Sequence, residues 1–360
     1  MKQQEKKMVK VGVIGCGMIA TEEHIPSYKK CKDAEIKYFC DIIPERAEKA
    51  AAAYGNGSIA CTDYHDVLAD PEVDAISVCT PNNMHARISI DALYAGKQVL
   101  CEKPAARTYA EALEMQKAQH ETGNTLNIGV VNRFSPAVNK IKEMIDNGDL
   151  GEVYHVYASF RRYRGIPGLG GAFTTKSISG GGVLIDIGVH NLDIVMYCTG
   201  DPELLTVSGK AFSKLGVDMK NYVYDGMWAE DKKDLNGTYD VDDFVTAFIR
   251  TSGPTITING AWAQNIGESD AFIDFLGTKG GIRLTYGADF VYYTVKDGKL
   301  YNEKPEFKSR DMFQNEIDSF VRCVQTGEKL PSHIDKNILT SKLMQGIYDS
   351  SDRGEEVKFK

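Results

Sequence analysis

Along the first third of the chain, short apolar runs alternate with amphipathic stretches, as in a parallel sheet with crossover helices. The apolar runs predict strands at residues 9–14, 35–40, 75–79, 98–101 and 125–131. The amphipathic stretches predict helices at residues 45–54, 84–95 and 109–122, and an apolar piece near Ile59 followed by residues 63–68 fills the remaining crossover. This pattern predicts two mononucleotide-binding halves that end near Arg133.

The pattern changes after that point. A helix is predicted at residues 137–147, and alternating apolar and polar positions predict strands at 153–160, 205–212, 243–250, 255–262, 271–276 and 282–285. Two further helices, at 312–325 and 337–350, close the chain. We therefore expect an α/β protein of two domains. Residues 1–133 form a Rossmann domain with a doubly wound parallel sheet, and residues 134–360 form a substrate-binding domain with a large, mostly antiparallel open sheet.

Composition supports this division and narrows the partners. A chain of 360 residues is long for one domain, and 42% hydrophobic with 26% charged residues is typical of a globular protein. The net charge of −8 argues against nucleic acid or an anionic membrane as a partner, and we expect no membrane-spanning segment. The apolar residues near the N-terminus form the first predicted strand, so we expect no cleaved signal.

The eight cysteines are scattered along the chain and show no metal-ligand spacing. We therefore expect reduced thiols, a cytoplasmic location and no metal site.

The first predicted strand ends in a glycine-rich turn. From residue 15 the sequence reads Gly-Cys-Gly-Met-Ile-Ala, which fits Gly-x-Gly-x-x-Ala between a strand and a helix. Gly15 allows the tight turn, Gly17 lets the backbone approach a pyrophosphate, and Ala20 lets the helix pack against the strand. The helix start at Met18 and Ile19 then presents amide groups to the phosphates. The turn predicts a dinucleotide site.

Asp41 follows the second predicted strand, about 20 residues after the turn, where an acidic side chain binds the adenosine ribose. A cap for the helix that begins near Pro44 is the alternative role. Because a carboxylate repels a 2′-phosphate, we expect the cofactor to be NAD, with NADP less favoured.

A first group of polar residues follows the strand at 75–79, at the sheet edge where ligands bind in open parallel sheets. It contains Thr80, Pro81, Asn82 and His85. Cofactor binding and a capped helix start both agree with this segment. We expect Asn82 and His85 to face the cofactor or to shape its site.

A second group, Glu102 and Lys103, follows the strand at 98–101. Partial desolvation at a strand end lowers the pKa of a lysine towards a useful range. Pro104 fixes the turn, and a cis bond between Lys103 and Pro104 is expected. An ordinary exposed charge pair is the alternative interpretation of Glu102 and Lys103.

A third group lies in the second predicted domain, where glycines 180–182 precede an apolar helix that contains Asp186, His190 and Asp193. The spacing i, i+4 and i+7 puts these residues on one face of an α-helix. A buried carboxylate and imidazole are costly unless they are paired or used, so we expect Asp186 and His190 to take part in chemistry. We expect the glycines to let substrate and nicotinamide approach the helix start. The alternatives are a core histidine and a metal site, for which no third ligand is evident.

Together these motifs resemble the Gfo/Idh/MocA oxidoreductase family, the group of glucose–fructose oxidoreductase and inositol dehydrogenase. The resemblance covers nearly the whole chain, because it also includes the runs at 132–134, 242–244 and 276–281. It implies NAD(P)-dependent oxidation or reduction of sugars and polyols, and an open sheet that forms homodimers or homotetramers. Lys103, Asp186 and His190 match the catalytic positions of the family.

We hypothesise that a hydride moves between nicotinamide and a carbinol carbon while Lys103 and His190 contact the reacting oxygen. His190 is favoured as the proton acceptor, Lys103 is the alternative, and Asp186 orients the pair. Besides these three, substrate contacts are predicted at Arg133, Arg162, Arg164 and Lys176.

Two other classes of function remain at this point. One is a hydrolase or lyase that oxidises a sugar transiently with tightly held NAD, although the Tyr-Pro-Thr-His stretch of such relatives is absent. The other is an inactive sensor of sugar or dinucleotide, which the presence of Lys103, Asp186 and His190 argues against.

Overall fold

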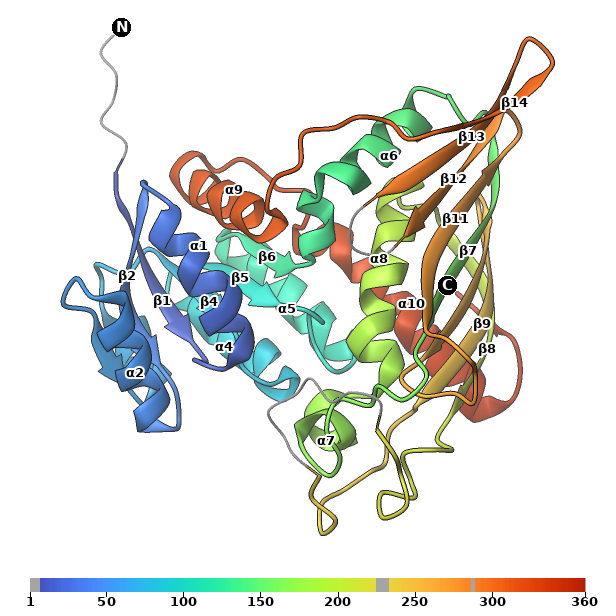
Figure 1. The fold of residues 1–360 in the computed structure, drawn as a ribbon. Helices are drawn as coiled ribbons and strands as arrows, with labels where there is room; N and C mark the ends of the chain where they lie inside the picture. The colour runs from blue at the N-terminus through green and yellow to red at the C-terminus, as the bar shows by residue number, and fades with distance from the viewer. Residues whose placement is uncertain (1–6, 225–232, 286–288, 360) are drawn as a thin grey trace, which may run out of the picture. The chain divides into compact units, whose positions relative to one another are not determined.

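The computed structural model describes residues 7–224, 233–285 and 289–359 (Figure 1). The chain divides into two compact units. Residues 1–134 and 310–338 form the first, and residues 135–309 and 339–360 form the second. Residues 310–338 thus pack with the first unit, although the sequence pattern assigned everything after residue 133 to the second domain. The reason is that this late helical segment buries its apolar face against the first sheet.

The first unit contains a six-stranded parallel sheet in the order β3-β2-β1-β4-β5-β6. The strands are β1 (Val9–Ile14), β2 (Ala34–Cys40), β3 (Ile59–Cys61), β4 (Ala75–Val78), β5 (Gln98–Glu102) and β6 (Leu126–Gly129). The strand order reverses between β1 and β4, which is the point where ligands bind in doubly wound folds. All four residues of β4 are buried, as expected for a central strand covered on both faces.

Helices cover both faces of this sheet. They are η1 (Ala20–His24), α1 (Ile25–Lys30), α2 (Pro44–Tyr54), α3 (Tyr64–Ala69), α4 (Asn82–Tyr94), α5 (Tyr109–Thr122), η2 (Val131–Phe134) and α9 (Met312–Thr326). One apolar cluster joins β1 and β2 to α1, α2 and α9. A second cluster joins the sheet to α3, α4 and α5. The predicted Rossmann architecture is confirmed.

The second unit contains a nine-stranded sheet in the order β14-β13-β12-β11-β7-β10-β9-β8-β15. Its strands are β7 (Val153–Arg161), β8 (Leu204–Phe212), β9 (Phe244–Thr251), β10 (Thr255–Ala261), β11 (Asp270–Gly277), β12 (Gly280–Thr285), β13 (Phe290–Lys296), β14 (Lys299–Glu303) and β15 (Val357–Lys358). Among the described strands of this second sheet, only β7 and β10 pair in parallel, so the mostly antiparallel sheet is confirmed.

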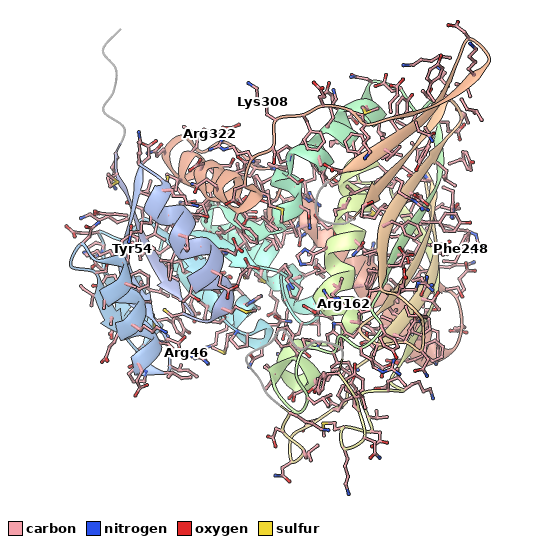
Figure 2. All side chains as sticks on the ribbon, in the orientation of Figure 1. Arg46, Tyr54, Arg162, Phe248, Lys308 and Arg322 are labelled. Carbon is pink, nitrogen blue, oxygen red and sulfur yellow. The ribbon has the colours of Figure 1, made fainter. Side chains whose placement is uncertain are left out.

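The helical segments of this unit are α6 (Pro136–Asp146), η3 (Ala172–Thr174), α7 (Lys176–Ser179), η4 (Leu184–Gly188), α8 (Val189–Cys198) and most of α10 (Ile334–Arg353). Figure 1 shows α6, α8 and α10 on one face of the nine-stranded sheet. The other, bare face is covered by no described helix, and Phe248 points outward from it, away from these helices (Figure 2). The sheet is open, as predicted.

One segment, Lys176–Cys198, is long and apolar enough to cross a membrane by length and composition alone, which the sequence interpretation had not expected. Its most apolar stretch is 78% buried inside the unit. The segment packs in the main apolar cluster of the second unit, so its apolar character is explained by burial in the core.

Candidate active site

The glycine-rich turn after β1 has two glycines with different surroundings. Gly15 has a φ of +92°, and its amide donates to the Cys40 carbonyl at 2.8 Å. A Cβ at Gly15 would lie 2.5 Å from the carbonyl oxygen of Cys79, so only glycine fits there. A Cβ at Gly17 would meet no described heavy atom within 4 Å. Gly15 therefore allows the turn, and Gly17 leaves open space beside it, where a pyrophosphate fits.

The helix that follows begins at Met18 and Ile19 and passes into the π-helical turn η1. The first amides of a helix have no partner within it and carry the positive end of its dipole. Ala20 is fully buried against the sheet, as the motif requires. This helix start fits an anionic phosphate group.

Asp41 connects the end of β2 to the glycine-rich turn. Its Oδ2 accepts a hydrogen bond from the Cys16 amide at 2.8 Å, and its Oδ1 accepts one from the Ile43 amide at 2.9 Å. The side chain does not cap α2 in the usual way, because Ile43 is the N-cap residue and has no side-chain cap. Each carboxylate oxygen has a second lone pair that a ribose hydroxyl can use.

The segment after β4 is held by His85, which is 1% exposed. Its Nδ1 lies 2.7 Å from the Pro104 carbonyl and its Nε2 lies 2.8 Å from the Thr80 carbonyl. Burial lowers the pKa of His85 below its ordinary value. Both ring nitrogens contact main-chain oxygens, so His85 shapes the site by joining the loops after β4 and β5.

Other residues of this segment lie where the sequence predicted them. Pro81 is the N-cap residue of α4 and Asn82 is its first residue. The hydroxyl of Thr80 is buried and has no hydrogen-bond partner among the described residues. A buried hydroxyl without a partner at this sheet edge fits a ligand with polar groups.

Glu102 and Lys103 are not an exposed charge pair, because Glu102 is 6% exposed. Its Oε1 lies 2.8 Å from Nε2 of His24, and its Oε2 accepts the Lys103 amide at 3.1 Å. Burial would raise the pKa of Glu102, but the hydrogen bond with His24 and the charge of Lys103 outweigh it, so the pKa is lowered. The peptide bond between Lys103 and Pro104 is cis, as expected.

These residues follow β1, β2, β4 and β5, whose carboxyl ends share one edge of the parallel sheet. The open space at Gly17, the helix start and the carboxylate of Asp41 fit a dinucleotide whose pyrophosphate and ribose lie along this edge. Among the described residues, no group of His, Cys, Asp and Glu could hold a metal ion.

In the second unit, Asp242 occupies the start of the helix that contains Asp186. Its carboxylate accepts the Gly182 amide at 2.8 Å, the Leu184 amide at 3.0 Å and the Tyr348 hydroxyl at 2.7 Å. A Cβ would lie 2.1 Å from the Tyr348 hydroxyl at Gly181 and 1.8 Å from the Asp242 carbonyl at Gly182. These two glycines are therefore required by internal packing. The expectation that they make room for a ligand was wrong for them.

Asp186 is held from a second side. Nε1 of the fully buried Trp262 donates to its Oδ2 at 3.0 Å, and Asp186 is 9% exposed. The Trp262 amide in turn donates to the Asp243 carbonyl at 2.9 Å. Sequence reasoning missed Trp262, because 76 residues separate it from Asp186.

The helix around Asp186 differs from the predicted one. Asp186 lies in the π-helical turn η4, and His190 lies in α8, half-buried. Because a π turn bonds i to i+5, the following residues are rotated relative to a regular α-helix. Asp193 is 1% exposed and accepts the Thr340 hydroxyl at 3.2 Å, which gives it a structural contact in the core.

The four remaining predicted substrate contacts have different surroundings. Arg133 is 2% exposed, and its Nη1 donates to the Pro331 carbonyl at 2.7 Å within the first unit. Arg164 donates to the Gln264 carbonyl at 2.7 Å and also to the Asn265 side chain. The Arg162 guanidinium, labelled in Figure 2, has no hydrogen-bond partner among the described residues.

Lys176 is exposed at the start of α7, and its amide donates to Asp240 Oδ1 at 2.6 Å.

The two-unit fold and the candidate dinucleotide site at the edge of the parallel sheet are typical of an oxidoreductase. Comparison with known proteins identifies the family. Residues 9–130 match the model of an oxidoreductase family with an NAD-binding Rossmann fold, Gfo/Idh/MocA. Residues 138–283 match the Gfo/Idh/MocA C-terminal domain. The chain belongs to this family, and the resemblance inferred from the sequence is confirmed. The protein is thus an NAD-dependent oxidoreductase.

Similar proteins include a D-glucoside 3-dehydrogenase of Escherichia coli (strain K12), 31% identical over 97% of both chains. Another is a scyllo-inositol 2-dehydrogenase (NAD(+)) of Bacillus subtilis (strain 168), 27% identical over 89% of this chain and 87% of that protein. A solved structure of levoglucosan dehydrogenase, in complex with NADH and levoglucosan, has a TM-score of 0.84. It is 21% identical and covers 97% of this chain and 99% of that one, so it shows the common fold.

Proposed function

We propose that this protein oxidises a secondary hydroxyl of a sugar, polyol or sugar derivative with NAD, and that D-glucosides are the first substrates to test. The single observation that carries the substrate class is the 31% identity with a D-glucoside 3-dehydrogenase along 97% of both chains. The relatives named for inositol and levoglucosan point to the same chemical group, a ring carbon that bears a hydroxyl.

Lys103, Asp186 and His190 carry the reaction in this proposal. NAD supplies the hydride acceptor when it is bound. Lys103 of the first unit holds and polarises the reacting hydroxyl, and His190 of the second unit takes its proton. Asp186 orients the pair, and this role is supported by the two structural contacts that fix the acid itself, the Trp262 indole and the Asp242-capped helix start.

Cofactor binding in this proposal uses the edge of the parallel sheet. Gly15, Gly17, Met18 and Ile19 bind the pyrophosphate, and Asp41 binds the adenosine ribose. The remaining cofactor contacts are assigned to the segment 80–82 and to Glu102 and Lys103. His85 holds these two segments in place, because its ring nitrogens contact the Thr80 and Pro104 carbonyls.

Arg162 and Lys176 are the proposed sugar contacts of the second unit, because Arg162 lies in the loop after β7, Lys176 is exposed at the start of α7, and both side chains carry hydrogen-bond donors. Arg164 acts indirectly, since its donors hold the 264–265 segment. Arg133, the fourth predicted contact, supports the site through its bond to Pro331.

We further propose that copies of this chain associate through the bare face of the nine-stranded sheet. Large side chains are exposed there, with Tyr157 at 46%, Phe248 at 37% and Tyr293 at 41%. An apolar face of this kind is typical of a protein interface. The eight cysteines are all free thiols, which supports a reducing, cytoplasmic location.

The experiment is a spectrophotometric screen of NAD and NADP with D-glucosides, inositols, levoglucosan and sugar acids. We expect NAD to be reduced with at least one glucoside or related sugar, and NADP to be poorer. Release of a cleaved product without net NAD reduction would contradict the proposal and favour the hydrolase or lyase, a function that none of the named relatives supports. No turnover with any sugar, together with normal NAD binding, would also contradict it.

A further inference from the structure

The first unit contains a buried acid that the proposed function does not use. Glu316, on α9, is 1% exposed, and neither of its carboxyl oxygens has a hydrogen-bond partner among the described residues. Its neighbours on the helix, Ile317 and Phe320, are in the apolar core. Since an ionised carboxylate is very costly in such surroundings, this side chain requires a special explanation.

Glu316 is connected to Lys103 through helix η1, His24 and Glu102. Helix α9 packs against η1, the element that carries His24. His24 contacts Oε1 of Glu102, and Oε2 of Glu102 accepts the Lys103 amide. The negative charge of Glu102 in turn acts on Glu316. Helix α9 packs against η2, α1, β1 and η1. The titratable or charged side chains of these elements and of α9 itself are Arg133 on η2, Tyr28, Lys29 and Lys30 on α1, Lys10 on β1, Glu22, Glu23 and His24 on η1, and Asp318, Arg322 and Cys323 on α9. Beyond them, Cys79 and Glu102 interact electrostatically with Glu316.

The two buried acids differ in their partners. Glu102 has donors on both oxygens, and its pKa is lowered despite burial. Glu316 has none, and burial first and the charge of Glu102 second raise its pKa well above the ordinary value. Nε2 of His24 faces Glu102, and its buried Nδ1 has no hydrogen-bond partner among the described residues. These contacts favour the ionised form of Glu102 and the neutral form of Glu316.

We propose that Glu316 stays protonated, and that it is a positioning residue which keeps Glu102 ionised between His24 and the Lys103 amide. If Glu316 were ionised, its negative charge would attract His24 and the proton it shares with Glu102. The contact between His24 and Glu102 would then be weakened. The main chain at Lys103 would then lose its anchor. The part of this inference that concerns catalysis rests on the proposed role of Lys103.

The protonation state is tested by the pH dependence of stability, which needs no substrate. A carboxyl with a raised pKa in the folded state destabilises the fold progressively as the pH rises from the ordinary pKa, 4.5, to the raised value. Glu316→Gln keeps the shape of the neutral acid and cannot ionise. In urea unfolding across this range, the unfolding constant of the wild type should rise about tenfold per pH unit relative to that of E316Q.

Asp318→Asn is the matched control, since it removes one carboxylate from the same helix. Asp318 is half-buried and bonded to Arg310 at 2.6 Å, so its ionised form already has a partner. D318N should follow the pH dependence of the wild type. A stability difference between E316Q and the wild type that does not change with pH would overturn the assignment of the proton to Glu316.

The positioning role is tested with NAD and methyl D-glucoside by the pH profile of kcat/KM. The wild type and D318N should lose activity towards alkaline pH earlier than E316Q does, because only they can ionise Glu316. If E316Q shows the predicted stability change but the same kcat/KM profile as the wild type, Glu316 is a proton holder without a positioning role. Absence of turnover in the wild type would contradict the proposed function. The stability test would still show whether Glu316 is protonated in the folded protein.

Discussion

The two glycine-rich turns of this protein look alike in sequence and differ in their surroundings. Both precede a buried helix, and both pass into a π-helical turn, η1 in the first unit and η4 in the second. The turn at 15–20 has open space at Gly17. The turn at 180–182 is filled by the carboxylate and carbonyl of Asp242 and by the Tyr348 hydroxyl.

The comparison teaches that a glycine, which has no side chain, has two different uses in these turns. At Gly17 it leaves room for something outside the described chain, and at Gly182 it makes room for the chain itself. An anion is needed at each helix start, because the amides there have no partner within the helix. The second unit supplies such an anion from Asp242, and in the proposed function a phosphate group of the cofactor takes the corresponding place in the first unit.

The largest expected effects concern two residues. Lys103 lies at the same edge of the parallel sheet as the first turn, and His190 follows the second turn in the sequence. Lys103→Ala and His190→Ala should each lower kcat by roughly 10²-fold or more, because in the proposed mechanism each removes a group that contacts the reacting proton or oxygen. Steady-state kinetics with NAD and the best sugar of the screen measures this loss, and circular dichroism checks that both variants fold.

The control for the lysine is Lys97→Met. Lys97 is 5% exposed and its Nζ donates to the carbonyls of Asp70 at 2.6 Å and Val73 at 2.9 Å, so its role is structural. K97M should lower the melting temperature and keep kcat. Near-normal turnover in both K103A and H190A would reject their assignment.

Next in size are alanine substitutions at the two turns themselves. Gly182→Ala should lower the free energy of unfolding by about 3 kcal/mol, because the new Cβ overlaps Asp242 in a packed core. Gly17→Ala should keep the stability of the wild type, since the added methyl meets no described atom, and should weaken NAD binding by about tenfold, since in the proposed site it meets the dinucleotide. Urea unfolding and calorimetric titration measure the two quantities. If G17A bound NAD normally, the distinction between an open and a filled turn would fail.

The smallest expected effect concerns cofactor choice. Asp41→Ser should raise the ratio of kcat/KM for NADP to that for NAD, because it removes the carboxylate that repels a 2′-phosphate. A modest loss of stability should accompany it, since Asp41 accepts the amides of Cys16 and Ile43. Asp63→Asn, at the exposed cap of α3, changes the charge of the same unit by the same amount and should leave the ratio alone. An unchanged ratio in D41S would remove Asp41 from the ribose site.

Much of the fold was predictable because burial leaves a periodic trace in the sequence. The central strand Val9–Ile14 and the helix Tyr109–Thr122 were predicted with their observed bounds. The strands β13, β14 and β15 were missed. No residue of β14 is buried, so it has no apolar run that a sequence pattern can detect.

The site was predictable only where its parts are close in sequence. The turn at 15–20 and the cis proline after Lys103 depend on local residue types, and both were found. His24, Asp242 and Trp262 were not given these roles, because their partners are 78, 60 and 76 residues away. Only the fold brings such pairs together, and their spacing in the sequence does not predict the contact.

The central claim, that Lys103 and His190 act on the same hydroxyl, is tested most directly by a double-mutant cycle on kcat. Residues that act as a unit show strongly non-additive effects. The account predicts that K103A/H190A loses about as much activity as either single variant, roughly 10²-fold. A loss near the product of the two single effects, about 10⁴-fold, would show that the two residues act independently and would contradict the account.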